Sequence, residues 1–167
     1  MLLSRLVAGG FDLVCDLEEA DLVIINTCGF IDDAKKEAID NILYAVSLKE
    51  EGIIRSVVVT GCLAERYQQE ILNEIPEVDA VIGTTAYEDV KKAIEEALKG
   101  NYTKCIKDID YLPSQDARRV FSTGTCYSYL KIAEGCNKHC TYCIIPKLRG
   151  SYRSVPMEEL IRQAEYL

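Results

Sequence analysis

Three short apolar runs in the first hundred residues share one pattern: each is followed by small polar residues and then by a stretch with apolar positions at helical spacing. The runs are rich in β-branched or other aliphatic residues, which predicts three buried strands, at 22–25, 57–59 and 80–82. The spacing after them predicts three helices, over about 32–50, 64–74 and 85–99. Strands that alternate with helices predict right-handed crossovers and a parallel sheet covered on both faces, which is an α/β fold.

Polar residues at the helix ends indicate how the first and third helices are capped. Asp32 or Asp33 can cap the first helix, and Gly52 can end it. Thr85 and Glu88 have the spacing of a capping box for the third helix. The first helix should bury Ala34, Ala38, Ile39, Ile42, Ala45 and Val46. The third helix should bury Tyr87, Val90, Ile94, Ala97 and Leu98.

The periodic pattern ends after about residue 104, which predicts a domain over 1–104 and a linker over 105–125. The linker contains Pro113, Ser114 and Gly124 and has no periodicity. In the remaining segment, 126–167, we expect a strand from Tyr127 to Ala133, a cysteine-rich loop, and a helix that starts near Val155. This segment is too short to close a core of its own, so we interpret it as the first strand–loop–helix of a larger domain.

Composition narrows the class of protein. The chain has 167 residues, of which 49% are hydrophobic and 28% charged, with a net charge of −8, as in an ordinary globular domain. No apolar run reaches the roughly 18 residues of a membrane span, and no secretion signal is visible. Eight cysteines in such a chain indicate reduced thiols with a metal or redox role, so we expect a cytoplasmic protein.

The charge is uneven along the chain. Residues 1–100 hold 9 lysines and arginines against 20 aspartates and glutamates, a balance of −11, whereas residues 101–167 have a balance of +3. An acidic domain repels phosphate backbones, which disfavours a nucleic-acid partner. A solvated acidic surface and a surface that attracts a basic protein both remain open.

The clearest chemical signal is the C-x3-C-x2-C spacing of Cys136, Cys140 and Cys143, directly after the predicted strand. Three thiolates are one short of the four that usually hold a [4Fe–4S] cluster, which would leave one iron free to bind a small molecule. The alternative is a structural zinc site in which His139 is the fourth ligand.

A second pair, Cys28 and Cys62, follows two of the predicted strands in similar glycine-containing turns, Asn26-Thr-Cys-Gly and Thr60-Gly-Cys. If these strands are parallel neighbours, both thiols lie at the carboxyl edge of the sheet, where open α/β sheets bind ligands. A lone cysteine there is usually a small buried residue. Two such cysteines favour a shared ligand.

The stretch Ala133-Glu-Gly-Cys-Asn-Lys-His-Cys-Thr-Tyr-Cys-Ile-Ile-Pro-Lys-Leu-Arg-Gly150, followed by Ser151-Tyr-Arg-Ser154, resembles the signature of radical S-adenosylmethionine methylthiotransferases. The resemblance implies that the three cysteines of the loop bind a [4Fe–4S] cluster and that its open iron binds S-adenosylmethionine. It also implies that Tyr142 packs against this cofactor; the alternative is a core aromatic. Arg149 could face the carboxylate of the cofactor, or could be solvated or paired with another loop, which is the interpretation we prefer for Arg153.

The same family has an amino-terminal α/β domain with a second [4Fe–4S] cluster, held by three cysteines at strand ends and involved in supplying sulfur. Cys28 and Cys62 match the second and third of these ligands. No residue matches the first, because the chain starts at Met1 in what reads as the helix after the opening strand. In the family that strand lies inside the sheet, so we expect the chain alone to aggregate or to bind this cluster poorly. Cys15, Cys105 and Cys126 are interpreted as incidental or packing residues, with Cys15 in or at the end of a strand.

The stretches Asn26-Thr-Cys-Gly-Phe-Ile31 and Ile144-Ile-Pro-Lys-Leu-Arg-Gly150 resemble the branch of the family that modifies an aspartate of a small-subunit ribosomal protein. The resemblance thus implies a transferase with two iron–sulfur clusters and S-adenosylmethionine, a basic ribosomal protein as substrate, a reductant such as flavodoxin or ferredoxin, and no membrane. The chain alone should be inactive. The alternatives are the transfer-RNA-modifying branch and a non-catalytic zinc-binding scaffold.

Overall fold

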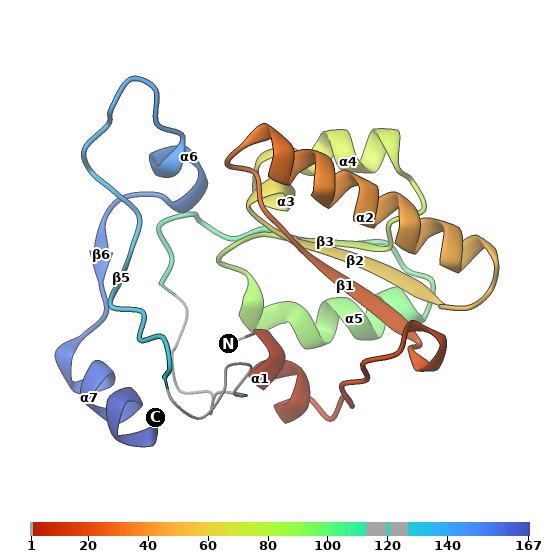
Figure 1. The fold of residues 1–167 in the computed structure, drawn as a ribbon, viewed down its shortest axis with the longest axis horizontal. Coiled ribbons are helices and arrows are strands. Elements are labelled where there is room, and N and C mark those ends of the chain that lie inside the picture. The colour runs from red at the N-terminus through yellow and green to blue at the C-terminus, as the bar shows by residue number, and fades with distance from the viewer. Residues whose placement is uncertain (1, 113–119, 121–126) are drawn as a thin grey trace.

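A four-stranded parallel sheet is the centre of the fold in the computed structural model, which describes residues 2–112, 120 and 127–167 (Figure 1). Its strands are β1 (Leu22–Thr27), β2 (Ser56–Gly61), β3 (Ala80–Ile82) and β4 (Thr103–Cys105), adjacent in that order. β1 and β2 pair along six residues each, from Leu22 beside Ser56 to Thr27 beside Gly61. The expected α/β class is therefore confirmed, with the three predicted strands in place.

Helices cover both faces of the sheet (Figure 1). One face carries α2 (Asp32–Glu50), α3 (Cys62–Arg66) and α4 (Gln68–Glu74), and the other carries α1 (Leu2–Ala8) and α5 (Val90–Leu98). Successive residues of β2 point to opposite faces: Val57 and Val59 pack with α2, whereas Val58 packs with α1 and α5. Because all three valines are completely buried, the central strand reads as a continuous apolar run.

Several expected details of the helices are wrong. The helix predicted over 64–74 is two helices, since Tyr67 has φ −117° and ψ 28° and interrupts it. Neither Asp32 nor Asp33 caps α2, whose cap position is Ile31 with no side-chain hydrogen bond; Asp32 instead accepts from Lys35 at 2.7 Å. Within α2, Ile39 is 41% exposed, because it lies beside the face that packs on the sheet.

The capping box expected at Thr85 and Glu88 does not form. A 3₁₀ turn, η2 (Tyr87–Asp89), precedes α5, and neither start has a side-chain capping bond. Glu88 accepts from the Tyr111 hydroxyl at 2.5 Å and from Lys107 Nζ at 3.2 Å. Of the residues expected to be buried by the third helix, Val90, Ile94 and Ala97 are buried, whereas Tyr87, which lies in η2, and Leu98 are only partly buried. The Glu88 carboxylate therefore binds Tyr111 and Lys107, which are distant in sequence, rather than the backbone of its own turn.

β4 lies at the predicted boundary between the periodic domain and the aperiodic linker, where the sequence predicted no strand. It is three residues long and half-exposed, so no apolar run marks it, and it forms by pairing with β3. The 3₁₀ turn η1 (Leu17–Glu19) precedes β1, and Cys15 lies in an exposed bend before it, not in a strand. Pro113, Ser114, Gly124 and Cys126 fall outside the described residues.

The carboxyl-terminal segment forms a small second unit beside the sheet (Figure 1). β5 (Ala133–Glu134) pairs antiparallel with β6 (Arg153–Ser154), and α6 (Ile145–Arg149) and α7 (Met157–Tyr166) complete it. The strand predicted from Tyr127 is wrong up to residue 132. Tyr127 and Tyr129 are 60% and 73% exposed and have no regular structure, so the alternating pattern here does not correspond to a strand.

From the family resemblance we expect the missing opening strand to lie inside the sheet, which would leave the edges of its two neighbours unpaired. β1 and β2 are direct hydrogen-bonded neighbours, so neither presents an open edge to the other. Among the described strands of this sheet, the outer edges of β1 and β4 are the unpaired ones.

Within the described part of the chain, every helix is too short or too polar to cross a membrane.

Candidate functional site

The carboxyl ends of β1 and β2 place Cys28 and Cys62 at one edge of the sheet, as the sequence predicted. Cys28 directly follows Thr27, and Cys62 directly follows Gly61, its partner in the register. Cys28 is exposed, whereas Cys62 is the first residue of α3 and is partly buried. The two thiol-bearing turns are therefore adjacent and open to solvent on one side.

Hydrogen bonds of the Thr27 side chain to the backbone, and close packing at two glycines, hold these two turns together. The Thr27 hydroxyl donates to the carbonyl of Thr60 at 2.6 Å and accepts from the Ala64 amide at 3.4 Å. Gly61 has φ +100°, and a Cβ there would collide with the Thr27 carbonyl. A Cβ on Gly29 would lie 3.0 Å from the Cys62 backbone. Glycine is required at position 61, and a larger residue at position 29 would push the two backbones apart by a few tenths of an ångström.

The cysteine loop follows β5 and is anchored at both ends by hydrogen bonds. The Cys136 amide donates to the carbonyl of Gly150 at 3.1 Å, and the Tyr152 amide donates to Asn137 Oδ1 at 2.8 Å. The Cys143 amide closes a turn onto the carbonyl of Cys140 at 3.0 Å. Cys136 and Cys143 are partly buried and Cys140 is exposed.

The cysteines of the loop do not converge in this structure. Over residues 2–112, 120 and 127–167, no three cysteine, histidine or acidic side chains come together in a group that could hold a metal ion. His139 is exposed and has a left-handed backbone, with φ 47°. The geometry thus favours the iron–sulfur interpretation and the zinc interpretation equally. The ligand roles of these residues stay predictions.

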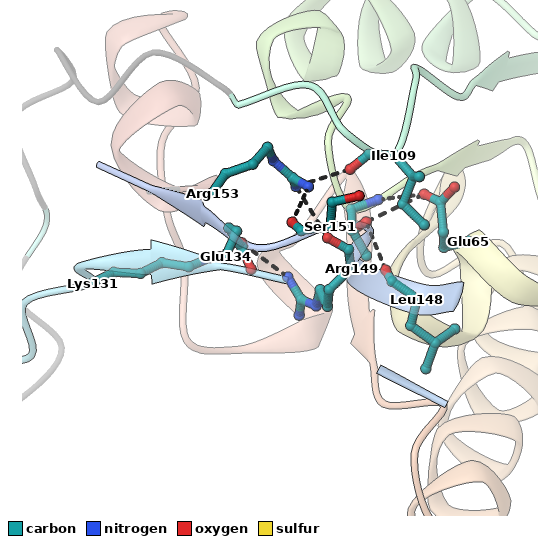
Figure 2. Close-up of polar contacts among 9 residues, drawn as sticks. Glu65, Ile109, Lys131, Glu134, Leu148, Arg149, Ser151 and Arg153 are labelled. Atoms are coloured by element: carbon teal, nitrogen blue, oxygen red, sulfur yellow. Dashed lines mark hydrogen bonds and ion pairs between the residues drawn. The ribbon is translucent and has the colours of Figure 1, made fainter. Parts of the chain in front are cut away.

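Arg149 connects the loop segment to the sheet edge. Its guanidinium lies 3.4 Å from Glu134 Oε1 (Figure 2). The Cys62 thiol is close enough for its charge to act on Arg149. Burial works to lower the pKa of Arg149, but the Cys62 thiolate, Glu134 and Tyr87 together outweigh it and raise the pKa. Arg149 is therefore a firmly held cation beside a candidate ligand.

Further contacts fix α6 against α3. Glu65, on α3, accepts from the Thr84 amide at 2.8 Å, and the Thr84 hydroxyl lies 3.4 Å from both Glu65 Oε2 and the carbonyl of Leu148. Leu148 is 2% exposed at this contact. Sequence reasoning missed Glu65 and Thr84 as interface residues; the small polar residues after the third strand were the available signal.

Arg153 is paired with another loop, as we preferred, and is not solvated. Its guanidinium donates to the carbonyl oxygens of Ile109, Arg149 and Ser151 at 2.6–3.0 Å (Figure 2). It also donates to Asp110 Oδ1 at 2.8 Å. Asp110 Oδ1 also accepts from the Ser151 amide at 2.7 Å. Nothing in the sequence pointed to Asp110.

The remaining candidates are placed as follows. Tyr142 is 90% exposed, so the alternative of a core aromatic is wrong, and its role toward a cofactor stays a prediction. Cys105 ends β4 and packs against the core below the sheet, as expected for a packing residue. Cys15 is exposed and therefore incidental rather than packing.

Comparison with known proteins agrees with this architecture. Residues 1–83 match the model of a family described as uncharacterized protein family UPF0004. The parallel sheet with its two cysteine turns, together with this match and the relatives below, defines the class: the chain belongs to the methylthiotransferase family.

Within this family the chain is similar to the ribosomal protein uS12 methylthiotransferase RimO of several bacteria. It is 54% identical to that of Lachnoclostridium phytofermentans and 47% identical to that of Clostridioides difficile, in each case over 95% of this chain and 36% of the relative. It is 45% identical to that of a Thermoanaerobacter species over 99% of this chain and 38% of the relative. The resemblance read from the sequence is confirmed, and the chain spans somewhat more than a third of the length of these relatives.

Proposed function

We propose that this chain supplies the first part of a radical S-adenosylmethionine methylthiotransferase, which inserts sulfur and a methyl group into a C–H bond of an aspartate in ribosomal protein uS12. The names of the relatives support the substrate and the transferase class. The observation that best supports the reaction type is the packing of α6, which follows the cysteine loop, on α3, which begins with Cys62. That packing places the helix that follows the cysteine loop beside the helix that begins with Cys62.

The donor atoms suit the proposed cofactors. Cys136, Cys140 and Cys143 would hold one [4Fe–4S] cluster, and Cys28 and Cys62 would supply two ligands of a second; thiolate sulfur is the usual protein donor to such clusters. When bound, the first cluster with S-adenosylmethionine supplies a radical that abstracts hydrogen. The loop cysteines would have to turn toward a common point to bind it, since the described side chains do not converge.

Other residues of the chain have roles that do not depend on the cofactor geometry. Gly29 and Gly61 keep the turns of Cys28 and Cys62 in backbone contact. Arg149 places a permanent positive charge beside Cys62, which offsets the negative charge that thiolate ligands bring to this edge. The exposed ring of Tyr142 is free to pack against a bound cofactor.

We propose a cytoplasmic location and a small electron-transfer protein, such as flavodoxin or ferredoxin, as reductant. The acidic balance of residues 1–100 supports a basic ribosomal protein over transfer RNA as the substrate, because like charges repel. Transfer RNA would be the substrate under the alternative branch. A direct comparison of binding to purified uS12 and to transfer RNA at one salt concentration separates the two.

Anaerobic reconstitution with iron and sulfide tests the cofactor part of the proposal. We expect a brown protein with broad absorption near ~400 nm, whose iron and sulfide content falls strongly when Cys136, Cys140 and Cys143 are changed to serine. Cys28→Ser with Cys62→Ser should remove any remaining, separate share of iron. Cys15→Ser, at an exposed cysteine away from both sites, is the matched control and should change nothing.

Two results would overturn the proposal. One is tight, colourless zinc binding with no iron uptake, which identifies the loop as a zinc site. The other is iron uptake that is equal in the wild-type chain and in the loop variant. Turnover by the chain alone is not expected, and the substrate is tested separately by the uS12 binding comparison.

A further inference from the structure

A groove of about 720 Å³ lies between the segment that precedes β1 and the carboxyl-terminal half of α2. Its apolar wall and floor consist of Leu17, Tyr44, Leu48 and Ile53. Leu48 is buried, but Leu17, Tyr44 and Ile53 are 39%, 56% and 39% exposed. Three large exposed apolar side chains in one hollow are unusual for a surface that faces water alone, and they mark a contact surface.

The charged residues at this groove are all acidic. Asp16, Glu18 and Glu51 line it, and no basic side chain does. Asp16 accepts from the Glu18 amide at 3.1 Å, which holds the short 3₁₀ turn in place. Within the described part of the chain, no ion pair involves Glu18 or Glu51, so both carboxylates are available to a partner.

The nearest cations of the chain are already engaged elsewhere. Lys49, the basic residue in the last turn of α2, donates to both oxygens of Asp79 at 2.7 Å. Arg55 pairs with Asp21 at 3.8 Å. Glu51 is itself the C-cap of α2, and the carbonyl end of a helix also favours cations. The lining of the groove therefore carries negative charge alone among the described residues.

The groove is separate from the cysteine edge of the sheet. Asp16 and Leu17 precede the amino end of β1, and Ile53 precedes the amino end of β2, whereas Cys28 and Cys62 follow the carboxyl ends of the same strands. α2 spans the distance between the two edges in Figure 1. A partner could thus occupy the groove, which Cys15 also lines, without covering Cys28 or Cys62.

We propose that this groove is a docking site for a basic protein segment, which places an apolar side chain between Leu17 and Tyr44 and lysine or arginine side chains beside Glu18 and Glu51. Apolar contact provides the burial, and charge complementarity selects a basic partner over an acidic one. The inference rests on the groove alone and does not require the proposed chemistry at the cysteines.

The test measures binding of a short, fluorescently labelled synthetic peptide of lysine and leucine to the full chain, by fluorescence anisotropy at low and moderate salt. A peptide with glutamate in place of lysine and one with serine in place of leucine are the probe controls. The groove variant is Glu18→Lys with Glu51→Lys. Its matched control is Glu37→Lys with Asp40→Lys, which makes the same change in net charge at exposed positions of α2 that do not line the groove.

We expect the groove variant to weaken binding of the lysine–leucine peptide about tenfold and the matched control to weaken it less than about threefold. Tyr44→Ser should weaken binding while leaving the charge unchanged. Far-ultraviolet circular dichroism and the unfolding midpoint of each variant show that it is folded. Equal losses in both charge variants would overturn the proposal, because binding would then follow overall charge, and so would equal binding of the serine peptide or of the glutamate peptide.

Discussion

Lys49 Nζ lies 2.7 Å from both carboxylate oxygens of Asp79, and this pair joins the last turn of α2 to the start of β3. The same carboxylate accepts from the Ser56 hydroxyl at 3.0 Å and from the Val57 amide at 2.8 Å, where β2 begins. Lys49 also donates to the carbonyl of Glu77 at 2.7 Å. One carboxylate thus sets the positions of a helix end and two strand starts.

Asp79→Ala should therefore lower the free energy of unfolding by about 2–4 kcal/mol, because it leaves the buried Ser56 hydroxyl and Val57 amide without their acceptor and Lys49 without its counter-ion. Urea unfolding followed by circular dichroism measures it. Asp21→Ala removes an exposed ion pair with Arg55 and is the control, with an expected change below about 0.5 kcal/mol. Equal effects of the two substitutions would contradict the assigned role of Asp79.

Gly61→Ala should be severely destabilising and should separate the two cysteine turns. A Cβ at this position meets the Thr27 carbonyl, and φ is +100°. Gly52, with φ +76° and nothing near a Cβ, is the matched control: Gly52→Ala carries the backbone strain alone, about 1 kcal/mol. We expect Gly61→Ala to cost at least about 2 kcal/mol more, by urea unfolding. If the two alanine variants unfold at the same urea concentration, the close approach of the strands is not as described.

Arg153→Met should loosen the carboxyl-terminal unit from the sheet domain, because it removes a cation that joins Asp110 and Ile109 to Arg149 and Ser151. Hydrogen exchange of the amides in 145–154 should become about tenfold faster, while exchange in β2 stays the same. Arg153→Lys should restore little of the protection, since an ammonium lacks the planar set of donors.

Arg55→Met is the control for this experiment, because Arg55, directly before β2, forms an exposed ion pair with Asp21 and not with a residue of 145–154. Its exchange pattern should match that of the wild-type chain. Unchanged exchange in Arg153→Met would show that α6 is held without Arg153, by its packing on α3 and by the bond from Thr84 to the Leu148 carbonyl.

The parts of the fold that the sequence predicts well are those in which one residue pattern has one physical solution. Val57, Val58 and Val59 can be buried on both faces only in a central strand, and that strand fixes where Cys62 follows. β4 could not be predicted in this way, because three half-exposed residues become a strand only by pairing with β3.

The same reasoning explains what was missed at the site. The positions of Cys28 and Cys62 follow from strand order, whereas the contact of Arg149 with Cys62 depends on α6 docking against α3, which local sequence does not encode. Glu88 shows how a local signal can mislead. Its spacing from Thr85 is that of a capping box, but Tyr111 and Lys107, more than a dozen residues away, bind the carboxylate instead. Contacts between distant segments decide both cases.

Stability should fall at alkaline pH through groups that the folded chain keeps protonated. Burial, followed by the nearby Cys105 thiolate, raises the pKa of Tyr102 to about 12 from its ordinary 10.0. Burial, followed by Asp89, raises the pKa of Cys105 above its ordinary 9.0. In the pH range between the unfolded and folded values the native state binds more protons, so its stability declines as pH rises. The contribution is complete below about pH 9 for Cys105 and below about pH 10 for Tyr102.

Urea midpoints measured from pH 8 to pH 12 should therefore be flat at first and then decrease. Tyr102→Phe cannot ionise, so its decrease between pH 10 and pH 12 should be shallower than that of the wild-type chain. Tyr142→Phe, at a ring that is 90% exposed, is the matched control and should follow the wild-type curve. A Tyr102→Phe curve parallel to the wild-type curve above pH 10 would mean that the Tyr102 hydroxyl titrates alike in the folded and unfolded chains, in contradiction to the pKa that partial burial and Cys105 raise.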